Sequence, residues 1–410
     1  MSVLRTVEQQ LAEVLGRVSP TGAVPLSLAG AAGLTLAEPV RARVDVPVFD
    51  NSAMDGFAVR FSDVAGASAE RPVTLRVVAD LPAGTSHDPA LAPGEAARIM
   101  TGSALPTDAD TIVPFEDTRG GLADSLEVAT VLRPPKAAGA HVRRRGEDLG
   151  AGSVVLPAGT ALGPLQLSAA AATGIDRVVV ARPPRVLVVS TGSELVEPGA
   201  ELERGQIPES NSALLAGLVR ATGAELLRVA CVSDDPDDLR SVLAEIDDAD
   251  VVITSGGVSA GAYEPVKSAL SGEIAFTKVA MQPGKPQAFG RLSDGPLLFG
   301  LPGNPVSVAV SFEAFVRPAL LAMQGRAELF RPVLRLPAGA GWRTPPGRRQ
   351  YLPAAIDRSD PARWTVRPAT RGGSGSHLAA GLAYAEAYAV VPADVEAVAE
   401  GDLVDVMLMS

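Results

Sequence analysis

Cysteine, histidine, lysine and aromatic residues are all scarce in this chain of 410 residues. The single cysteine, Cys231, excludes an intramolecular disulfide, and its place in the apolar stretch 226–232 predicts a buried packing residue. The three histidines lie far apart without paired Cys or His spacing, so no zinc site is predicted. No run approaches the ~20 apolar residues of a membrane span, and the charged first twenty residues are unlike a signal peptide. We therefore expect a cytoplasmic protein without a membrane partner.

Positive charge is also in short supply. The chain has 36 Lys plus Arg against 47 Asp plus Glu, a formal net charge of −11. Non-specific nucleic-acid binding needs a net basic face, so we expect no nucleic-acid partner, and any anionic ligand must meet a local positive site. Apolar residues, at 47%, supply ample core material, and the length suggests roughly two to four domains.

The pattern of the sequence changes near residue 183. Before it, an amphipathic helix is predicted over 2–18, followed by short β-branched runs between Pro and Gly turns. After it, longer spacings favour parallel strands with helical crossovers; the strand candidates are 185–189, 226–232, 251–254, 274–279 and 297–299. A closing helix is predicted over 305–325, and short strands after it indicate a small separate β domain.

Polar turns follow these predicted strands, at the sheet edge where parallel α/β folds bind ligands. Glu194 and Asp234 would bring carboxylates to that edge, which suits Mg²⁺ held jointly with a substrate phosphate; capping of the helix that begins near Pro236 is an alternative role for Asp234. The loop Ser255-Gly256-Gly257-Val258-Ser259 could present N–H groups to a phosphate, or could simply be a tight turn.

One of the four lysines, Lys285, stands between two prolines in Pro283-Gly284-Lys285-Pro286, where restricted backbone helps to fix a point charge against a phosphate. A solvated turn lysine is the alternative. The Gly/Ser loop 371–376 could likewise be a linker or an anion-binding nest.

The most unusual string is FDNSAMDGFA at 49–58, a polar turn that propensity alone would place in an exposed loop. Taken with the segments 94–116, 142–149, 190–195, 254–259, 283–286 and 301–305, it resembles the molybdopterin molybdenumtransferase family, the bacterial MoeA-type enzymes also found as the C-terminal part of gephyrin. The similarity spans nearly the whole chain and keeps the family's order of motifs.

The resemblance implies a multidomain α/β protein. Its expected parts are an extended N-terminal domain (1–45 and 146–180), an inserted β-rich domain (46–145), a three-layer αβα module with a parallel-type sheet (181–327) and a small C-terminal β barrel (328–410). It also implies an elongated homodimer, with the active site where the α/β module of one subunit faces the N-terminal domains of the other.

The implied reaction takes adenylylated molybdopterin and molybdate and yields molybdenum cofactor plus AMP, with Mg²⁺ as cofactor. The catalytic residues carried over by motif position are Asp55, Thr101, Asp148, Glu194, Asp234 and Lys285, with Glu194 and Asp234 also as metal ligands. The expected substrate-binding residues are Ser255, Gly256, Gly257, Ser259, Glu264, Pro302, Pro305, Arg348 and Ser376.

Two positions depart from the family pattern. Glu264 stands where Asp is usual, and Gln282 stands where a basic residue is frequent. Molybdopterin adenylyl transfer and a non-catalytic, gephyrin-like scaffold are the alternative functions. The 49–58 motif argues against the first, and the retained carboxylates argue against the second.

Overall fold

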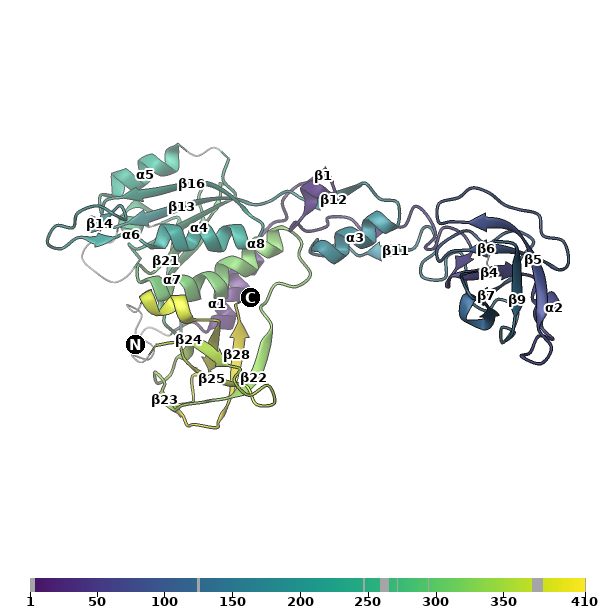
Figure 1. The fold of residues 1–410 in the computed structure, drawn as a ribbon. Coiled ribbons are helices and arrows are strands. Elements are labelled where there is room, and N and C mark those ends of the chain that lie inside the picture. Colours follow the sequence, from purple (N-terminus) through teal and green to yellow (C-terminus); the bar gives the residue numbers. More distant parts are fainter. Residues whose placement is uncertain are drawn as a thin grey trace.

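The computed structural model describes residues 4–123, 126–245, 248–258, 265–270, 272–293, 295–370 and 379–409. The molecule is elongated, with one β sheet at one end, two assemblies at the other, and a narrow connection between them (Figure 1). Ser259, Glu264 and Ser376, three of the expected substrate-binding residues, lie outside the described residues. The domain boundaries given above stay a prediction.

The far end of the molecule is built around a six-stranded sheet in the order β7-β4-β6-β5-β9-β8. Its strands are β4 (Gly56–Val59), β5 (Val73–Leu81), β6 (Glu95–Ile99), β7 (Thr111–Pro114), β8 (Thr118–Arg119) and β9 (Val128–Val131). Every residue of β4 is buried, because neighbouring strands pair on both of its sides. This fixes the turn that precedes β4, which contains Asp55.

The connection consists of two-stranded antiparallel ladders. β1 (Ala23–Ser27) pairs with β12 (Arg177–Ala181), β2 (Val40–Arg41) with β11 (Val154–Leu156), and β3 (Asn51–Ser52) with β10 (Val142–Arg143). The helix α3 (Pro164–Ala172) packs beside them. The chain thus passes outward and back through the same connection.

The α/β unit contains a six-stranded sheet in the order β16-β13-β17-β21-β20-β18. β13 (Arg185–Thr191), β16 (Glu225–Val232), β17 (Val251–Ser255) and β21 (Leu297–Leu301) are parallel, as predicted. The sequence analysis missed β20 (Pro286–Arg291), which runs antiparallel to both β21 and β18 (Ile274–Lys278). The sheet is therefore mixed.

Helices cover both faces of this sheet. α1 (Val7–Gly16) and α4 (Asn211–Ala221) pack on one face, together with a continuous helical stretch made of α7 (Pro305–Ser311), a π-helical turn (Phe312–Val316) and α8 (Arg317–Met323). α5 (Pro236–Ala244) and α6 (Pro265–Leu270) pack on the other. α1 is shorter than predicted because the Thr6 side chain caps it, accepting a hydrogen bond from Gln9 N–H at 3.1 Å.

The stretch Pro305–Met323 is long and apolar enough to cross a membrane by length and composition alone, so the expectation that no run reaches such a length was too strict. Of the most apolar 18 residues in this stretch, 83% are buried inside the protein, as in the core helix of a globular fold.

Cys231 is exposed, so the prediction of a buried packing residue was wrong. The reason is its place on β16, which forms an edge of the sheet and is exposed or half-buried at every position except Val232. An apolar stretch on an edge strand lacks the second neighbour that would cover it.

The C-terminal unit is a third six-stranded sheet, in the order β19-β24-β26-β28-β22 with β25 paired to β24. Its strands are β22 (Val333–Pro337), β24 (Arg349–Asp357), β25 (Thr365–Pro368), β26 (Ala387–Val391) and β28 (Leu403–Leu408), with β19 (Met281–Gln282) donated by the α/β unit. The short pair β23 (Trp342–Arg343) and β27 (Ala397–Val398) lies apart from this sheet. Through β19, the residues just before β24 come next to the loop that carries Lys285.

Candidate active site

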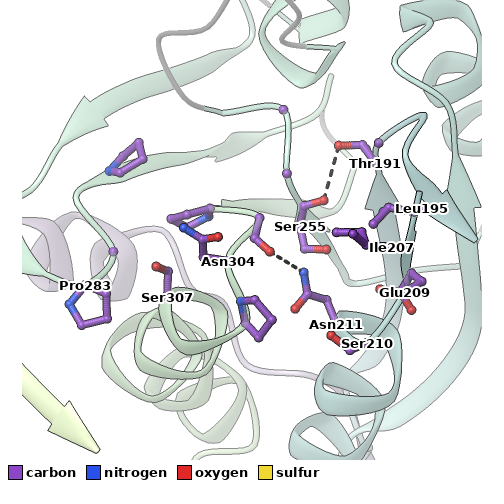
Figure 2. A pocket seen from close by; sticks show the side chains of 18 of the residues that line it. Thr191, Leu195, Ile207, Glu209, Ser210, Asn211, Ser255, Pro283, Asn304 and Ser307 are labelled. Atoms are coloured by element: carbon purple, nitrogen blue, oxygen red, sulfur yellow. Dashed lines mark hydrogen bonds between the residues drawn. The ribbon is translucent and has the colours of Figure 1, made fainter. Parts of the chain in front are cut away.

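A cavity of about 620 Å³ lies at the carboxyl ends of the four parallel strands. The turns after β13, β16, β17 and β21 all contribute to its wall, as the sequence predicted. In Figure 2, Pro283 and Ser307 lie on one side of the cavity, and Thr191 and Glu209 lie on the other. The expected site residues in its lining are Glu194, Asp234, Ser255, Gly256, Gly257, Lys285, Pro302, Pro305 and Arg348.

Two carboxylates, from Glu194 and Asp234, form one side of the cavity. Asp234 Oδ2 accepts a hydrogen bond from Ser193 N–H at 3.1 Å, which ties the β16 turn to the β13 turn. The Glu194 carboxylate folds back over Gly192, where an added Cβ would lie 2.7 Å from Glu194 Oε2. Among the described residues neither carboxylate has a cationic partner. The helix cap considered for Asp234 belongs to Asp235, whose side chain accepts from Asp237 N–H.

The glycine turn after β17 is shaped by close packing. Gly256 has φ +94°, and a Cβ there would lie 2.6 Å from the carbonyl oxygen of Thr191. Its N–H donates to Leu301 O at 3.0 Å, so it is not free to bind an anion. A Cβ at Gly257, with φ +65°, would lie 2.9 Å from Pro265. The tight-turn interpretation therefore holds for Gly256, and a phosphate-binding role depends on later residues of the loop.

The opposite side of the cavity carries positive charge. Lys285 and Arg348 both line it, although they come from the α/β unit and from the segment before β24. Arg348 Nη1 donates a hydrogen bond to Gln282 Oε1 at 2.7 Å. Gln282, which stands where the family frequently has a basic residue, therefore holds the Arg348 guanidinium in place. Within the described part of the chain neither cation has an ion-pair partner. The two charges are available to an anionic ligand.

A buried polar network in the wall of the cavity was missed by the sequence analysis. Glu209, only 8% exposed, accepts hydrogen bonds from the Ser190 hydroxyl at 2.8 Å and from Ser212 N–H at 2.9 Å. Ser190 in turn lies 3.1 Å from the Ser255 hydroxyl. Asn211 reaches across to the β21 turn, where its Nδ2 donates to Gly303 O at 2.7 Å (Figure 2). The polar residues 209–211, which lie between two of the predicted strands, were the only signal in the sequence for this network.

The pKa of the Cys231 thiol is affected by two carboxylates of the cavity wall. Burial raises its pKa above the usual value, and the carboxylates of Glu209 and Glu194 raise it further. The thiol is exposed yet largely protonated at neutral pH.

The other expected catalytic residues lie outside the α/β unit, Asp55 and Thr101 at the far end of the molecule and Asp148 in the connection. Asp55 and Thr101 are brought together, since Asp55 Oδ1 accepts from both the N–H and the hydroxyl of Thr101 at 2.7 Å. These hydrogen bonds, led by the backbone one, lower the pKa of the Asp55 carboxyl. Asp148 is exposed in the connection, where its N–H donates to Val46 O at 3.0 Å. None of the three lines the cavity of its own chain.

Comparison with known proteins identifies the family. Residues 5–174 match the MoeA N-terminal region (domain I and II), residues 187–322 match a probable molybdopterin binding domain, and residues 335–409 match the MoeA C-terminal region (domain IV). The chain belongs to the MoeA family.

Its MoeA relatives are similar over their full length. "Molybdopterin molybdenumtransferase 2" of Mycobacterium tuberculosis is 42% identical, with 97% of this chain and 98% of the relative covered. "Molybdopterin molybdenumtransferase" of Staphylococcus aureus is 32% identical, with 98% and 95% covered. A crystal structure of the molybdopterin biosynthesis MoeA protein of Pyrococcus horikoshii aligns with a TM-score of 0.81 at 28% identity, covering 99% of this chain and 100% of that one. These full-length matches do not favour the adenylyltransferase or scaffold alternatives.

Proposed function

We propose that this chain is a molybdopterin molybdenumtransferase of the cytoplasm, which takes adenylylated molybdopterin and molybdate and releases molybdenum cofactor and AMP. The observation that carries the proposal is the cavity at the strand ends, which is lined by two carboxylates and by two cations that have no ion-pair partner among the described residues. Its full-length relatives carry the name of this activity.

Charge neutralisation suits this reaction. Cleavage of a phosphoanhydride needs positioning and electrostatic stabilisation more than a covalent nucleophile. Lys285 and Arg348 would bind the oxyanions of molybdate or of the diphosphate, because both line the cavity and no described carboxylate neutralises them.

The carboxylate pair also fits Mg²⁺. This ion keeps several waters and is usually bound by one or two carboxylates plus substrate phosphates rather than by a cage of protein ligands. The described residues contain no cluster of three or more His, Cys, Asp or Glu side chains that could hold a metal, so substrate oxygens would complete the coordination. When bound, Mg²⁺ would neutralise charge that develops on the diphosphate.

A second copy of the chain would complete the site. Asp55 and Thr101 sit on the far end of the molecule, beside exposed apolar side chains at Val48 (48% exposed), Phe49 (44%) and Met54 (36%). Exposed apolar groups clustered around a polar turn are typical of an interaction surface. A homodimer in which this surface faces the partner's cavity would bring Asp55 to the substrate.

The test is to incubate purified protein with adenylylated molybdopterin, Mg²⁺ and molybdate and to measure AMP and active cofactor. AMP release should depend on molybdate, and Asp55→Ala and Glu194→Ala should each reduce it, whereas Asp176→Ala, at an exposed carboxylate in the connection, should not. Molybdate-independent AMP release, or none at all, would refute the proposed reaction. An unaltered rate in either site variant would remove that residue from the mechanism.

A further inference from the structure

The loop that carries Lys285 is held at two points of its backbone. The carbonyl of Lys285 accepts a hydrogen bond from Val279 N–H at 2.8 Å. The carbonyl of Gly284 accepts one from Nε2 of Gln287 at 2.7 Å. Because these two carbonyls belong to the peptide groups on either side of the Lys285 Cα, the pair of contacts restricts both backbone dihedrals of Lys285.

Gln287 joins this loop to a helix of the cavity wall. The second hydrogen on its Nε2 is directed to the hydroxyl of Ser311, also at 2.7 Å, so both donors of the amide are used. Ser311 is the last residue of α7, whose first residue, Pro305, lines the cavity. Gln287 is 3% exposed and Ser311 is fully buried, so water does not compete for these contacts.

Close packing supports the same link. Gly284 has φ +99°, and a Cβ there would lie 2.9 Å from Ser311 Oγ. The loop therefore rests directly on the end of α7, and the amide of Gln287 sets the spacing between them. A buried glutamine that served stability alone would not need to join the two segments that place Lys285 and Pro305 at the cavity.

We propose that Gln287 is a positioning residue for anion binding: by bridging Gly284 O and Ser311 Oγ, it fixes the Lys285 ammonium in the cavity. The proposal rests on the proposed function in taking molybdate as the anion. A misplacement of about 1 Å can reduce a rate roughly a hundredfold. Loss of this bridge should accordingly raise the KM for molybdate about tenfold to a hundredfold, with a smaller effect on kcat.

The experiment replaces Gln287 with methionine, which has similar length but no donor. The matched control is Gln324→Met, because Gln324 is 2% exposed and its Nε2 also donates to two backbone carbonyls, Thr222 O at 2.9 Å and Leu320 O at 3.0 Å, without lining the active-site cavity. Gln287→Met should raise the KM for molybdate, and Gln324→Met should only lower the melting temperature. The effect of Gln287→Met should vanish in a Lys285→Ala background. An equal increase in the KM for molybdate when Gln287→Met is made in the Lys285→Ala background, or when Gln324→Met is made instead, would overturn the proposal.

A second readout does not depend on the reaction. The chain has four lysines, and the other three, Lys136, Lys267 and Lys278, are exposed references for acylation measured peptide by peptide by mass spectrometry. Gln287→Met should raise the acylation rate of Lys285 severalfold relative to these references, and Ser311→Ala, which keeps the Gly284 contact, should raise it less. An unchanged relative rate in both variants would overturn the positioning role even if AMP release failed in the wild-type protein. If the wild-type protein releases no AMP but the acylation rate of Lys285 rises in Gln287→Met, only the proposed function is refuted.

Discussion

Replacing Gly256 with alanine tests the geometry of the cavity most directly. Two separate costs follow from the structure. Alanine at φ +94° is in the left-handed region, which costs roughly 1–2 kcal/mol. Its Cβ would also lie 2.6 Å from Thr191 O and 2.8 Å from Thr191 Oγ1, and overpacking of this kind typically costs about 1–3 kcal/mol. The free energy of unfolding should therefore fall by about 2–5 kcal/mol.

A matched glycine separates the two costs. Gly199 has φ +96°, and a Cβ there would meet nothing within 4 Å, so Gly199→Ala should show only the backbone cost of roughly 1–2 kcal/mol. Denaturant unfolding of the α/β unit, followed by a probe local to that unit, measures the difference between the variants. Separate probes are needed because a protein of several domains does not unfold in a single step.

The same variant should lose activity beyond its loss of stability. Thr191 leads directly into Gly192 and Glu194, so relief of the contact should shift the turn that carries the Glu194 carboxylate into the cavity. A shift of this kind should reduce kcat for AMP release by about tenfold or more at a temperature where the variant is folded. Equal stability loss in Gly256→Ala and Gly199→Ala, or normal kcat in the former, would refute the close approach of the two turns.

Three further predictions concern charged groups. Glu194→Gln and Asp234→Asn should each raise the Mg²⁺ concentration needed for half-maximal AMP release about tenfold or more, and an unchanged Mg²⁺ dependence would exclude that carboxylate as a ligand. Thr101→Val should raise the pKa of Asp55 toward its ordinary value, as NMR titration of the carboxyl would show. Because the pKa of Asp55 is depressed in the folded state, its hydrogen bonds stabilise the fold at neutral pH, and this contribution is lost as the pH falls through the folded-state pKa. Cys231 should react slowly with a thiol reagent at pH 7–8, and faster once Mg²⁺ neutralises the nearby carboxylates; a rate like that of an unperturbed thiol would contradict its raised pKa.

The ends of the central strands of the α/β unit could be predicted because these strands are buried on both faces. β17 and β21 are buried throughout, and such strands appear in the sequence as short, uniform apolar runs followed by polar turns. β20 could not be recognised, since Pro286–Arg291 mixes proline, glutamine and glycine with apolar residues and shows neither a uniform run nor an alternation. Its antiparallel direction depends on pairing partners that local sequence does not specify.

Arg348 shows a different limit of local reasoning. The family resemblance suggested this residue, but its position depends on the pairing of β19 with β24, which joins Met281 to Arg349. Glu209 and Asn211 were missed because both are buried by tertiary packing, whereas their residue types and spacing are those of an ordinary solvated turn before a helix. Propensity can predict the turn but not the network of serines behind it.

The elongated shape has a consequence for experiments that mix defective chains. A chain altered at Asp55 still has an intact cavity, and a chain altered at Glu194 still has an intact far end (Figure 1). If two molecules share each site as proposed, co-expression of these two inactive variants should restore partial activity by complementation, while either variant alone stays inactive. Mixing either defective variant with the normal protein should leave the activity per normal chain unchanged, because each mixed dimer keeps one complete site.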